Sequence, residues 1–317
     1  MKNIKDIFGV DEDYLVDVLV HNPGATGYLQ GAISEQILKE TLKAEGYEVY
    51  RIKEKPAGGF DNKIDNYKGD FLIRKPGSKD CFVVESKGVK TNSEFRGANK
   101  KTEINRKNII SFICCSLKND PMKVYNKGLA RYNKAKQAWE TKNPGKQFPE
   151  FQWNMEFPGS SSVNLNGFFA SEEDVKEYFN GICDELFSES AFRRRDAAYL
   201  KLETHKPSIR TDSVTKIKQA APLKSDFSIL AVDLFQRLGR HKIVFADSNQ
   251  LPHSPTSPNH LYQNYLIDII IPGKKDMLCI RKPWYESIGE LLDNSQPRVV
   301  PFDETQLDDR GHDGDEE

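Results

Sequence analysis

Hydrophobic and polar positions follow helical spacing in some parts of the chain and form short apolar runs in others. Helical spacing is clearest over residues 27–44, where Ile33, Ile37, Leu38 and Leu42 recur every three or four positions. The same spacing predicts further helices over 12–20, 100–118, 125–141, 171–188, 225–238 and 284–293. Short apolar runs bounded by turn residues predict strands over 47–52, 69–74, 81–87, 241–246, 264–271 and 277–281.

These elements predict an α/β or α+β fold with a mixed central sheet flanked by helices. A chain of 317 residues is long enough for one large domain or two smaller ones. The irregular stretch 142–168, which is rich in proline and serine, predicts a boundary near residue 150. The loop from Pro252 to Asn259 contains three prolines and is expected to lie outside the core.

Several classes of protein are made improbable by what the sequence lacks. No run approaches the ~18 apolar residues of a membrane helix, so no membrane association is expected. The first residues lead into no apolar segment, and the five cysteines form no Cys-x-x-Cys pair, which favours the cytoplasm. The chain also lacks the Gly-Lys-Ser/Thr of a phosphate-binding loop, so we expect no nucleotide cofactor.

The formal net charge of -1 conceals two basic stretches. Residues 74–136 hold sixteen bases and five acids, and residues 193–224 hold nine bases and three acids. Solvated helix faces would explain either stretch alone, whereas the two together favour a polyanionic partner. By contrast, residues 303–317 hold eight acids and one base, which predicts a disordered acidic tail.

The two short runs around residue 77 predict a hairpin with an acidic end. The turn Lys-Pro-Gly-Ser-Lys centres between Gly77 and Ser78, so cross-strand partners should have residue numbers that sum to 155. That register pairs Asp70 with Glu85, and Lys87 shares the face of Glu85. Opposed carboxylates repel unless one has a raised pKa, a lysine lies close, or a divalent cation binds both. A simple ion pair with Lys87 at the strand end is the structural alternative.

Asp70, followed after fourteen residues by Glu85-Ser86-Lys87, resembles the signature of the PD-(D/E)XK nucleases. The preceding helix with Glu35 and the strand at 47–52 are similar to that family's α-β-β-β-α order, and the resemblance covers residues 27–118. One departure is Gly69, which stands where the family's motif has proline.

The resemblance implies a nuclease core within residues 1–150 and a recognition and dimerisation region over 151–302. It implies that Mg²⁺ is held by Asp70, Glu85 and the carbonyl of Ser86, with Lys87 and Glu35 as further catalytic residues. The activity it implies is that of a type II restriction endonuclease, which cuts double-stranded DNA as a homodimer. Two alternatives remain open: a structure-specific repair or transposition nuclease, and a non-catalytic nucleic-acid-binding module.

The polar segment after the motif lies beside the proposed phosphate site. Basic and amide side chains there can grip DNA phosphates or read base edges, and a solvated loop is the alternative for each. The DNA-binding residues expected on this basis are Lys90, Asn92, Arg96, Asn99, Lys100, Lys101 and Arg106.

Overall fold

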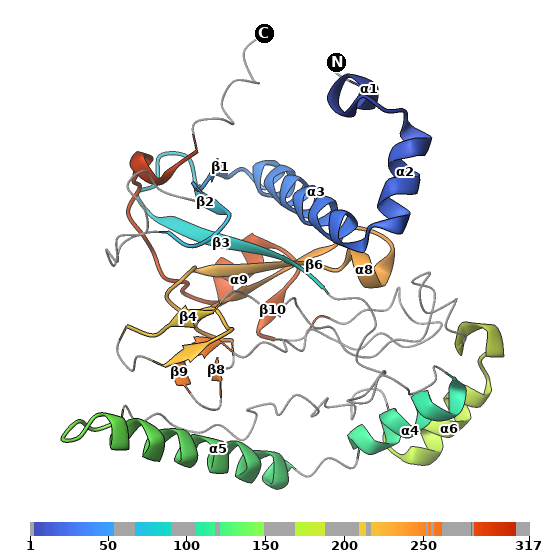
Figure 1. Ribbon diagram of the computed structural model, residues 1–317, viewed down its shortest axis with the longest axis vertical. Coiled ribbons are helices and arrows are strands. Elements are labelled where there is room, and N and C mark those ends of the chain that lie inside the picture. The colour runs from blue at the N-terminus through green and yellow to red at the C-terminus, as the bar shows by residue number, and fades with distance from the viewer. Residues whose placement is uncertain are drawn as a thin grey trace.

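A six-stranded sheet forms the centre of the computed structural model (Figure 1). Its strands lie in the order β1-β2-β3-β6-β7-β10, with the bounds β1 Glu48–Arg51, β2 Phe71–Arg74, β3 Cys81–Gly88, β6 Ile229–Asp233, β7 Ile243–Asp247 and β10 Trp284–Tyr285. The structure describes residues 3–53, 67–89, 105–117, 121–148, 169–187, 209–213, 217–251, 253–254, 257–261, 280 and 282–308.

The sheet is mixed. β3 and β6 are parallel, whereas the pairs β1–β2, β2–β3, β6–β7 and β7–β10 are antiparallel. The predicted hairpin register is confirmed, because Phe71, Leu72 and Ile73 pair with Val84, Val83 and Phe82. The fold is therefore α+β with a mixed central sheet flanked by helices, as the sequence predicted.

One face of the sheet is covered by α3 (Pro23–Ala44) and α9 (Ile288–Asn294) (Figure 1). Leu38 and Leu42 of α3 are buried in one core with Ile73, Val84 and other residues of that face. Positions three and four apart on α3 thus supply the stripe that packs on the sheet.

The opposite face packs into a second core that includes residues of α4 (Arg106–Leu117), α6 (Glu172–Asn180) and the 3₁₀ turn η2 (Asp184–Phe187). Leu72 and Val83 reach this core from the sheet. The remaining elements are α1 Ile4–Phe8, α2 Glu12–His21, α5 Pro121–Lys142, β4 Arg210–Thr211, β5 Lys218–Gln219, α8 Phe235–Leu238, β8 His253–Ser254, β9 Ser257–Leu261 and η4 Glu304–Gln306.

The largest error of the sequence prediction concerns residues 225–238. They were expected to form one helix, but they form the central strand β6 followed by the short helix α8. Every residue of β6 is buried, because β6 lies between β3 and β7 with both of its faces covered. Such a strand shows no alternation of polar and apolar positions, so its apolar residues also fit helical spacing.

Three smaller expectations also differ from the structure. The helix expected over 171–188 ends at Asn180 and is followed by η2, and the helix expected over 284–293 begins only after β10. In the loop expected outside the core, β8 and β9 form a hairpin, and His260 is buried. The strands predicted at 264–271 and 277–281 lie outside the described residues, apart from residue 280.

The two regions predicted on either side of residue 150 both contribute strands to the central sheet. Strands β1 to β3 come from residues before 150, and β6, β7 and β10 come from residues after it. A domain boundary near residue 150 remains a prediction. The tail is folded further than expected, because Leu307 bridges to Ile52 and is buried, and the described residues end at Asp308. In the described part of the chain, no helix is both long and apolar enough to cross a membrane.

Candidate functional site

The β2–β3 hairpin brings Asp70 and the Glu85-Ser86-Lys87 segment together. Asp70 precedes β2, and its backbone N–H donates to the Val84 carbonyl at 2.9 Å, but the ladder ends at the Phe71–Val84 pair, so the predicted pairing of Asp70 with Glu85 is not part of it. Its carboxylate Oδ2 accepts a hydrogen bond of 2.7 Å from the backbone N–H of Ser86. The carboxylate is therefore held against the strand that carries Glu85.

Lys87 binds two oxygen groups of its own strand. Its ammonium donates to Glu85 Oε1 and, at 3.1 Å, to the Ser86 carbonyl oxygen. The side chains of Glu85 and Lys87 keep exposed fractions of only 18% and 27%, so this pair is largely screened from water. The ion pair with Lys87, which the sequence analysis gave as the structural alternative to a metal site, is thus present.

Burial and neighbouring charges shift the pKa values of Glu85 and Lys87 in the cluster. Burial raises the pKa of Glu85 to about 7. The ammonium of Lys87 lowers this pKa, whereas the charges of Asp70 and Asp226 raise it further. Burial alone would lower the pKa of Lys87, but the carboxylates of Glu85, Asp70 and Glu35 raise it. Lys87 is therefore a firmly charged ammonium, while Glu85 resists ionisation.

Glu35 reaches the same electrostatic neighbourhood from α3, on the other face of the sheet. Its Oε2 lies 2.6 Å from the guanidinium of Arg51. Burial and the charge of Asp70 raise the pKa of Glu35, and Arg51 and Lys87 lower it. The structure thus brings Glu35 within the electric field of Asp70 and Lys87, while its direct partner is Arg51.

Gly69 allows β2 to approach β3 closely. A Cβ atom at this position would lie 2.5 Å from Val83 Cγ1 and 2.9 Å from the Val84 carbonyl oxygen. Both distances are shorter than van der Waals contact, and the second involves the backbone of β3. The close approach of the two strands therefore favours glycine at this position over any residue with a Cβ atom.

Two buried aspartates near the hairpin were missed by the sequence analysis. Asp226 lies just before β6; its Oδ1 is 3.4 Å from Lys68 Nζ, and its Oδ2 accepts from the Leu223 N–H at 2.9 Å and from Arg210 Nε at 3.2 Å. A carboxylate directly before an apolar run was a signal, since Asp70 precedes β2 in the same way. The wrong helix prediction over 225–238 concealed it.

Asp233, at the end of β6, fastens α3 to the sheet. Its Oδ2 accepts from Ser34 Oγ at 2.7 Å and lies 2.7 Å from His241 Nδ1, and its Oδ1 accepts from the Phe235 N–H at 3.0 Å. Ser34 directly precedes Glu35, and Asp233 pairs with Gly88 of β3. This anchor fixes the helix that carries Glu35 relative to the strand that carries Lys87.

The donor set of the cluster suits a hard cation. Asp70 and Glu85 offer carboxylate oxygens and Ser86 a carbonyl oxygen, which are the ligands that Mg²⁺ prefers. The ammonium of Lys87 already binds two of these three groups, so a cation is favoured there. Among the described residues, no group of three or more His, Cys, Asp and Glu side chains could hold a metal ion, so any metal there would depend on the carbonyl and on water.

Of the expected DNA-binding residues, only Arg106 lies within the described part of the chain; Lys90, Asn92, Arg96, Asn99, Lys100 and Lys101 lie outside it. Arg106 binds Asp184 at 2.8 and 2.6 Å, donates to the carbonyls of Phe179 and Ile182, and lies over the ring of Phe187. These contacts tie α4 to α6 and η2. The guanidinium is thus already occupied by protein groups.

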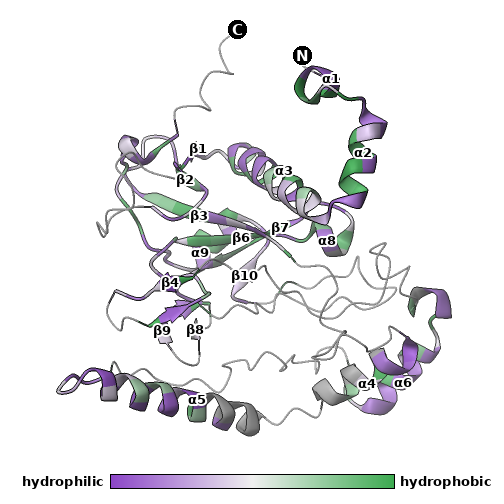
Figure 2. Ribbon diagram, viewed as in Figure 1, coloured by the Kyte–Doolittle hydropathy of each residue, from purple (hydrophilic) through white to green (hydrophobic). Residues whose placement is uncertain are grey.

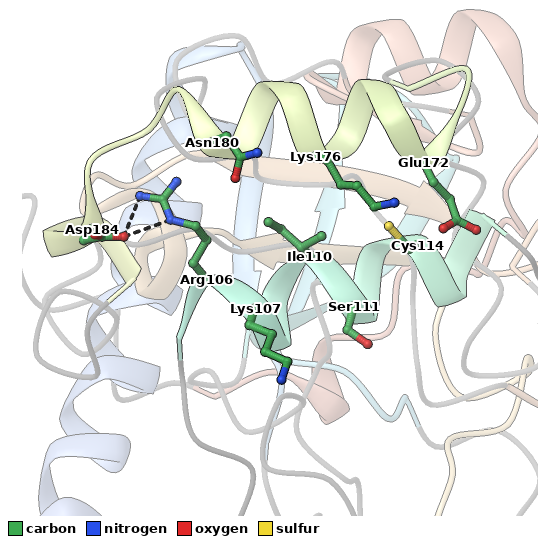
Figure 3. Close-up of a pocket in the computed structure, with 9 residues that line it drawn as sticks. All are labelled: Arg106, Lys107, Ile110, Ser111, Cys114, Glu172, Lys176, Asn180 and Asp184. Atoms are coloured by element: carbon green, nitrogen blue, oxygen red, sulfur yellow. Dashed lines mark hydrogen bonds and ion pairs between the residues drawn. The ribbon is translucent and has the colours of Figure 1, made fainter.

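A pocket of about 620 Å³ lies between α4 and α6 (Figure 3). Its lining mixes both charges and includes Arg106, Lys107, Glu172, Lys176 and Asp184. None of Asp70, Glu85 and Lys87 lines it. The pocket is therefore separate from the carboxylate cluster, and its mixed charge selects no class of ligand.

Part of the basic excess over 74–136 lies on α5. This helix has six bases and one acid, and Arg131, Lys134 and Lys142 are exposed. Tyr132 and Trp139 contact the ring of Phe148, at centroid distances of 5.7 and 5.6 Å. Packing of the aromatic residues leaves these three bases directed to solvent, where they can meet a polyanion.

No protein family, curated protein or solved structure matches the chain.

Proposed function

We propose that the chain is a Mg²⁺-dependent endonuclease of the PD-(D/E)XK type that cuts double-stranded DNA at specific sites, as type II restriction enzymes do. The observation that carries the proposal is the cluster of Asp70, Glu85 and Lys87 at one end of a buried hairpin in the predicted register. The carboxylate and carbonyl oxygens gathered there are of the kind that Mg²⁺ prefers as ligands, which supports the binding of a divalent cation.

Each residue of the cluster has a role in the proposal. Asp70, Glu85 and the Ser86 carbonyl would hold Mg²⁺, which when bound supplies a Lewis acid for the phosphoryl oxygen and the attacking water. Lys87, kept protonated by its three carboxylate neighbours, would stabilise the charge that develops on the phosphate. Glu35 would accept a hydrogen bond from a water at the edge of the site.

The basic surface supports a nucleic-acid substrate. The exposed bases of α5 can neutralise backbone phosphates, and such contacts position DNA without reading its sequence. Cleavage of both strands by one active site per chain requires two chains, so we propose a homodimer.

The test is digestion of a long, unmethylated DNA with and without Mg²⁺, with wild type beside Asp70→Asn. We expect discrete fragments that require Mg²⁺ and are absent with the variant. A smear would point to a nuclease without site specificity and contradict the restriction-type activity. Binding without any cleavage would overturn the nuclease proposal and favour a non-catalytic binding module.

A further inference from the structure

The buried aspartate Asp226 holds two basic side chains together. The side chain of Asp226 is only 2% exposed. Its Oδ1 lies 3.4 Å from Lys68 Nζ, and its Oδ2 accepts a hydrogen bond of 3.2 Å from Arg210 Nε. The side chains of Lys68 and Arg210 keep exposed fractions of 41% and 36%, so a ligand in solvent can reach both. We call Lys68 and Arg210 the basic pair.

The basic pair lies close to the carboxylate cluster. Lys68 is two residues before Asp70, a separation that a chain spans in at most ~7 Å. The backbone N–H of Lys68 donates to the Asp226 carbonyl at 3.3 Å, and Gly69 approaches β3 closely, so the chain between Lys68 and Asp70 is fixed. The charge of Asp226 also acts on Glu85. A ligand that extends beyond the cluster therefore comes within reach of Lys68.

The backbone around the basic pair is held before any ligand binds. Arg210 pairs with Gln219 in the β4–β5 hairpin, and its carbonyl accepts a hydrogen bond of 3.2 Å from Nε2 of the buried His260. Asp226 lies just before β6, which is buried throughout and mainly hydrophobic (Figure 2). Since these elements place both bases in advance, binding requires little further ordering.

The charges within this group of three side chains do not balance. Two bases face one carboxylate, which leaves one unit of positive charge where solvent has access. Asp226 Oδ1 accepts no hydrogen bond from the described residues, so Lys68 is attracted to it by charge without a directional bond. The ammonium can therefore direct its N–H donors at an anionic oxygen, such as those of a phosphate.

The basic pair also includes part of the second basic stretch of the sequence, residues 193–224. Arg210 belongs to this stretch, and so does Lys218, which is exposed on the neighbouring strand β5. Bases with access to solvent thus continue from Lys68, before the β2–β3 hairpin, onto β4 and β5. A small anion would need only one such position, whereas a polyanionic backbone contacts several.

We propose that Lys68 and Arg210 bind a phosphate of the DNA backbone next to the one held at the carboxylate cluster. The choice of DNA rests on the proposed function, which brings a phosphodiester to Asp70 and Glu85. Phosphates of one strand recur every ~3.4 Å along the duplex axis, so neighbours of the phosphate at the cluster come within reach of the pair. Such a contact positions the strand and reads no base.

The test is DNA binding without Mg²⁺, measured by fluorescence anisotropy of a labelled duplex over a range of salt concentrations. Lys68→Gln and Arg210→Gln keep an amide donor for Asp226 but lose the charge. We expect each to weaken binding and to reduce the slope of log affinity against log salt concentration by about 0.9. Lys68→Arg keeps the charge and should retain the wild-type slope. The matched control is Lys79→Gln, at an exposed position near the hairpin turn, which should also retain it.

Wild-type slopes for Lys68→Gln and Arg210→Gln would overturn the proposal. An equal loss in Lys79→Gln would do so as well, because overall charge would then set the slope. A slope lost in Lys68→Arg would assign Lys68 a structural role and have the same consequence. If circular dichroism shows that Arg210→Gln is unfolded, the two Lys68 variants carry the test.

The failure of this proposal can be distinguished from the failure of the proposed function, because binding is measured without Mg²⁺ and does not depend on cleavage. The expected slopes in a chain that never cuts DNA would refute the proposed function alone. Cleavage by a chain whose slopes do not change in the Lys68 and Arg210 variants would refute the basic pair alone.

Discussion

Asp70 Oδ2 accepts a hydrogen bond of 2.7 Å from the backbone N–H of Ser86, across the β2–β3 hairpin. This bond fixes the orientation of one carboxylate relative to the strand that carries the other two residues of the motif. It also allows the structural role of Asp70 to be separated from its proposed catalytic role, because an amide oxygen can accept the same hydrogen bond without the charge.

Asp70→Asn should therefore lose activity but keep stability. We expect Mg²⁺-dependent cleavage to fall by at least about a hundredfold, comparable to the removal of one group that stabilises the transition state. The free energy of unfolding should stay near the wild-type value, whereas Asp70→Ala should lower it by about 1–2 kcal/mol because the Ser86 N–H loses its partner. Urea unfolding of the three proteins measures this, and equal destabilisation by both variants would contradict it.

Glu85→Gln should stabilise the metal-free protein at alkaline pH. The pKa of Glu85 is about 7 in the folded chain and 4.5 in the reference state, so the folded state binds the additional proton between these values. Wild type therefore loses stability as pH rises from about 4.5 to 7, by roughly 1–3 kcal/mol from this group. Glu85→Gln lacks that loss. The free energy of unfolding in urea of the variant, relative to wild type, should therefore be higher at pH 8 than at pH 5. A difference between the two proteins that does not change with pH would contradict the prediction.

Gly69→Ala should destabilise the fold. The added Cβ would meet Val83 Cγ1 and the Val84 carbonyl, and the strand pairing cannot relax without loss, so we expect about 1–3 kcal/mol. Gly24→Ala is the matched control, because nothing lies within 4 Å of a Cβ atom there and alanine favours the helix. Thermal unfolding of both variants should show a lower midpoint for Gly69→Ala only.

His260 should make stability fall as the solution becomes acidic. Burial lowers the pKa of His260 below its reference value of 6.5, although the Arg210 carbonyl and nearby aspartates oppose this. The unfolded chain then binds a proton at a higher pH than the folded chain, so stability declines as pH drops below about 6.5. Between pH 7 and pH 5 this loss opposes the gain in stability from Glu85, so comparison with His260→Gln isolates it. As pH falls over this range, the thermal midpoint of His260→Gln should rise relative to that of wild type, and an unchanged difference would exclude this role.

Removal of the exposed bases of α5 should weaken DNA binding and its dependence on salt. The measurement uses Asp70→Asn protein, in which we expect no cleavage. Adding Arg131→Gln and Lys134→Gln should reduce the slope of log affinity against log salt concentration by about 0.9 for each phosphate that is no longer neutralised. Lys5→Gln, on α1 and outside α5, should leave the slope unchanged. Equal slopes for all three proteins would remove α5 from the proposed interface.

The register of the hairpin from Phe71–Val84 to Arg74–Cys81 could be predicted because its determinants are local. The turn around Gly77 fixes the register, and the register alone places Asp70 beside the strand of Glu85 and Lys87. Strand β6 could not be predicted in the same way. Its residues are apolar on both faces, and Ile229 finds its neighbour Val84 only through the fold, so no local pattern distinguishes it from a buried helix.

The same difference between local and distant determinants applies to the site. The cluster members within the hairpin were identified, whereas Asp226, which raises the pKa of Glu85, was not, because it approaches from the unrecognised strand. The prediction for Arg106 failed for the same reason. Its position after the motif predicted contact with DNA, but the region of α6 and η2 supplies the carbonyl and carboxylate groups that it binds. The sequence around Arg106 does not reveal these distant acceptors.

The parallel pairing of β3 with β6 joins residues 84–88 to residues 229–233. During translation, the strand that carries Glu85 and Lys87 therefore keeps one open edge until the ribosome has released the segment beyond residue 233. Pairings between such distant segments also form slowly. A nascent chain that ends near residue 150 contains Asp70, Glu85 and Lys87 but lacks β6, the strand that pairs with β3, so the proposed site would be complete only once most of the polypeptide has been synthesised.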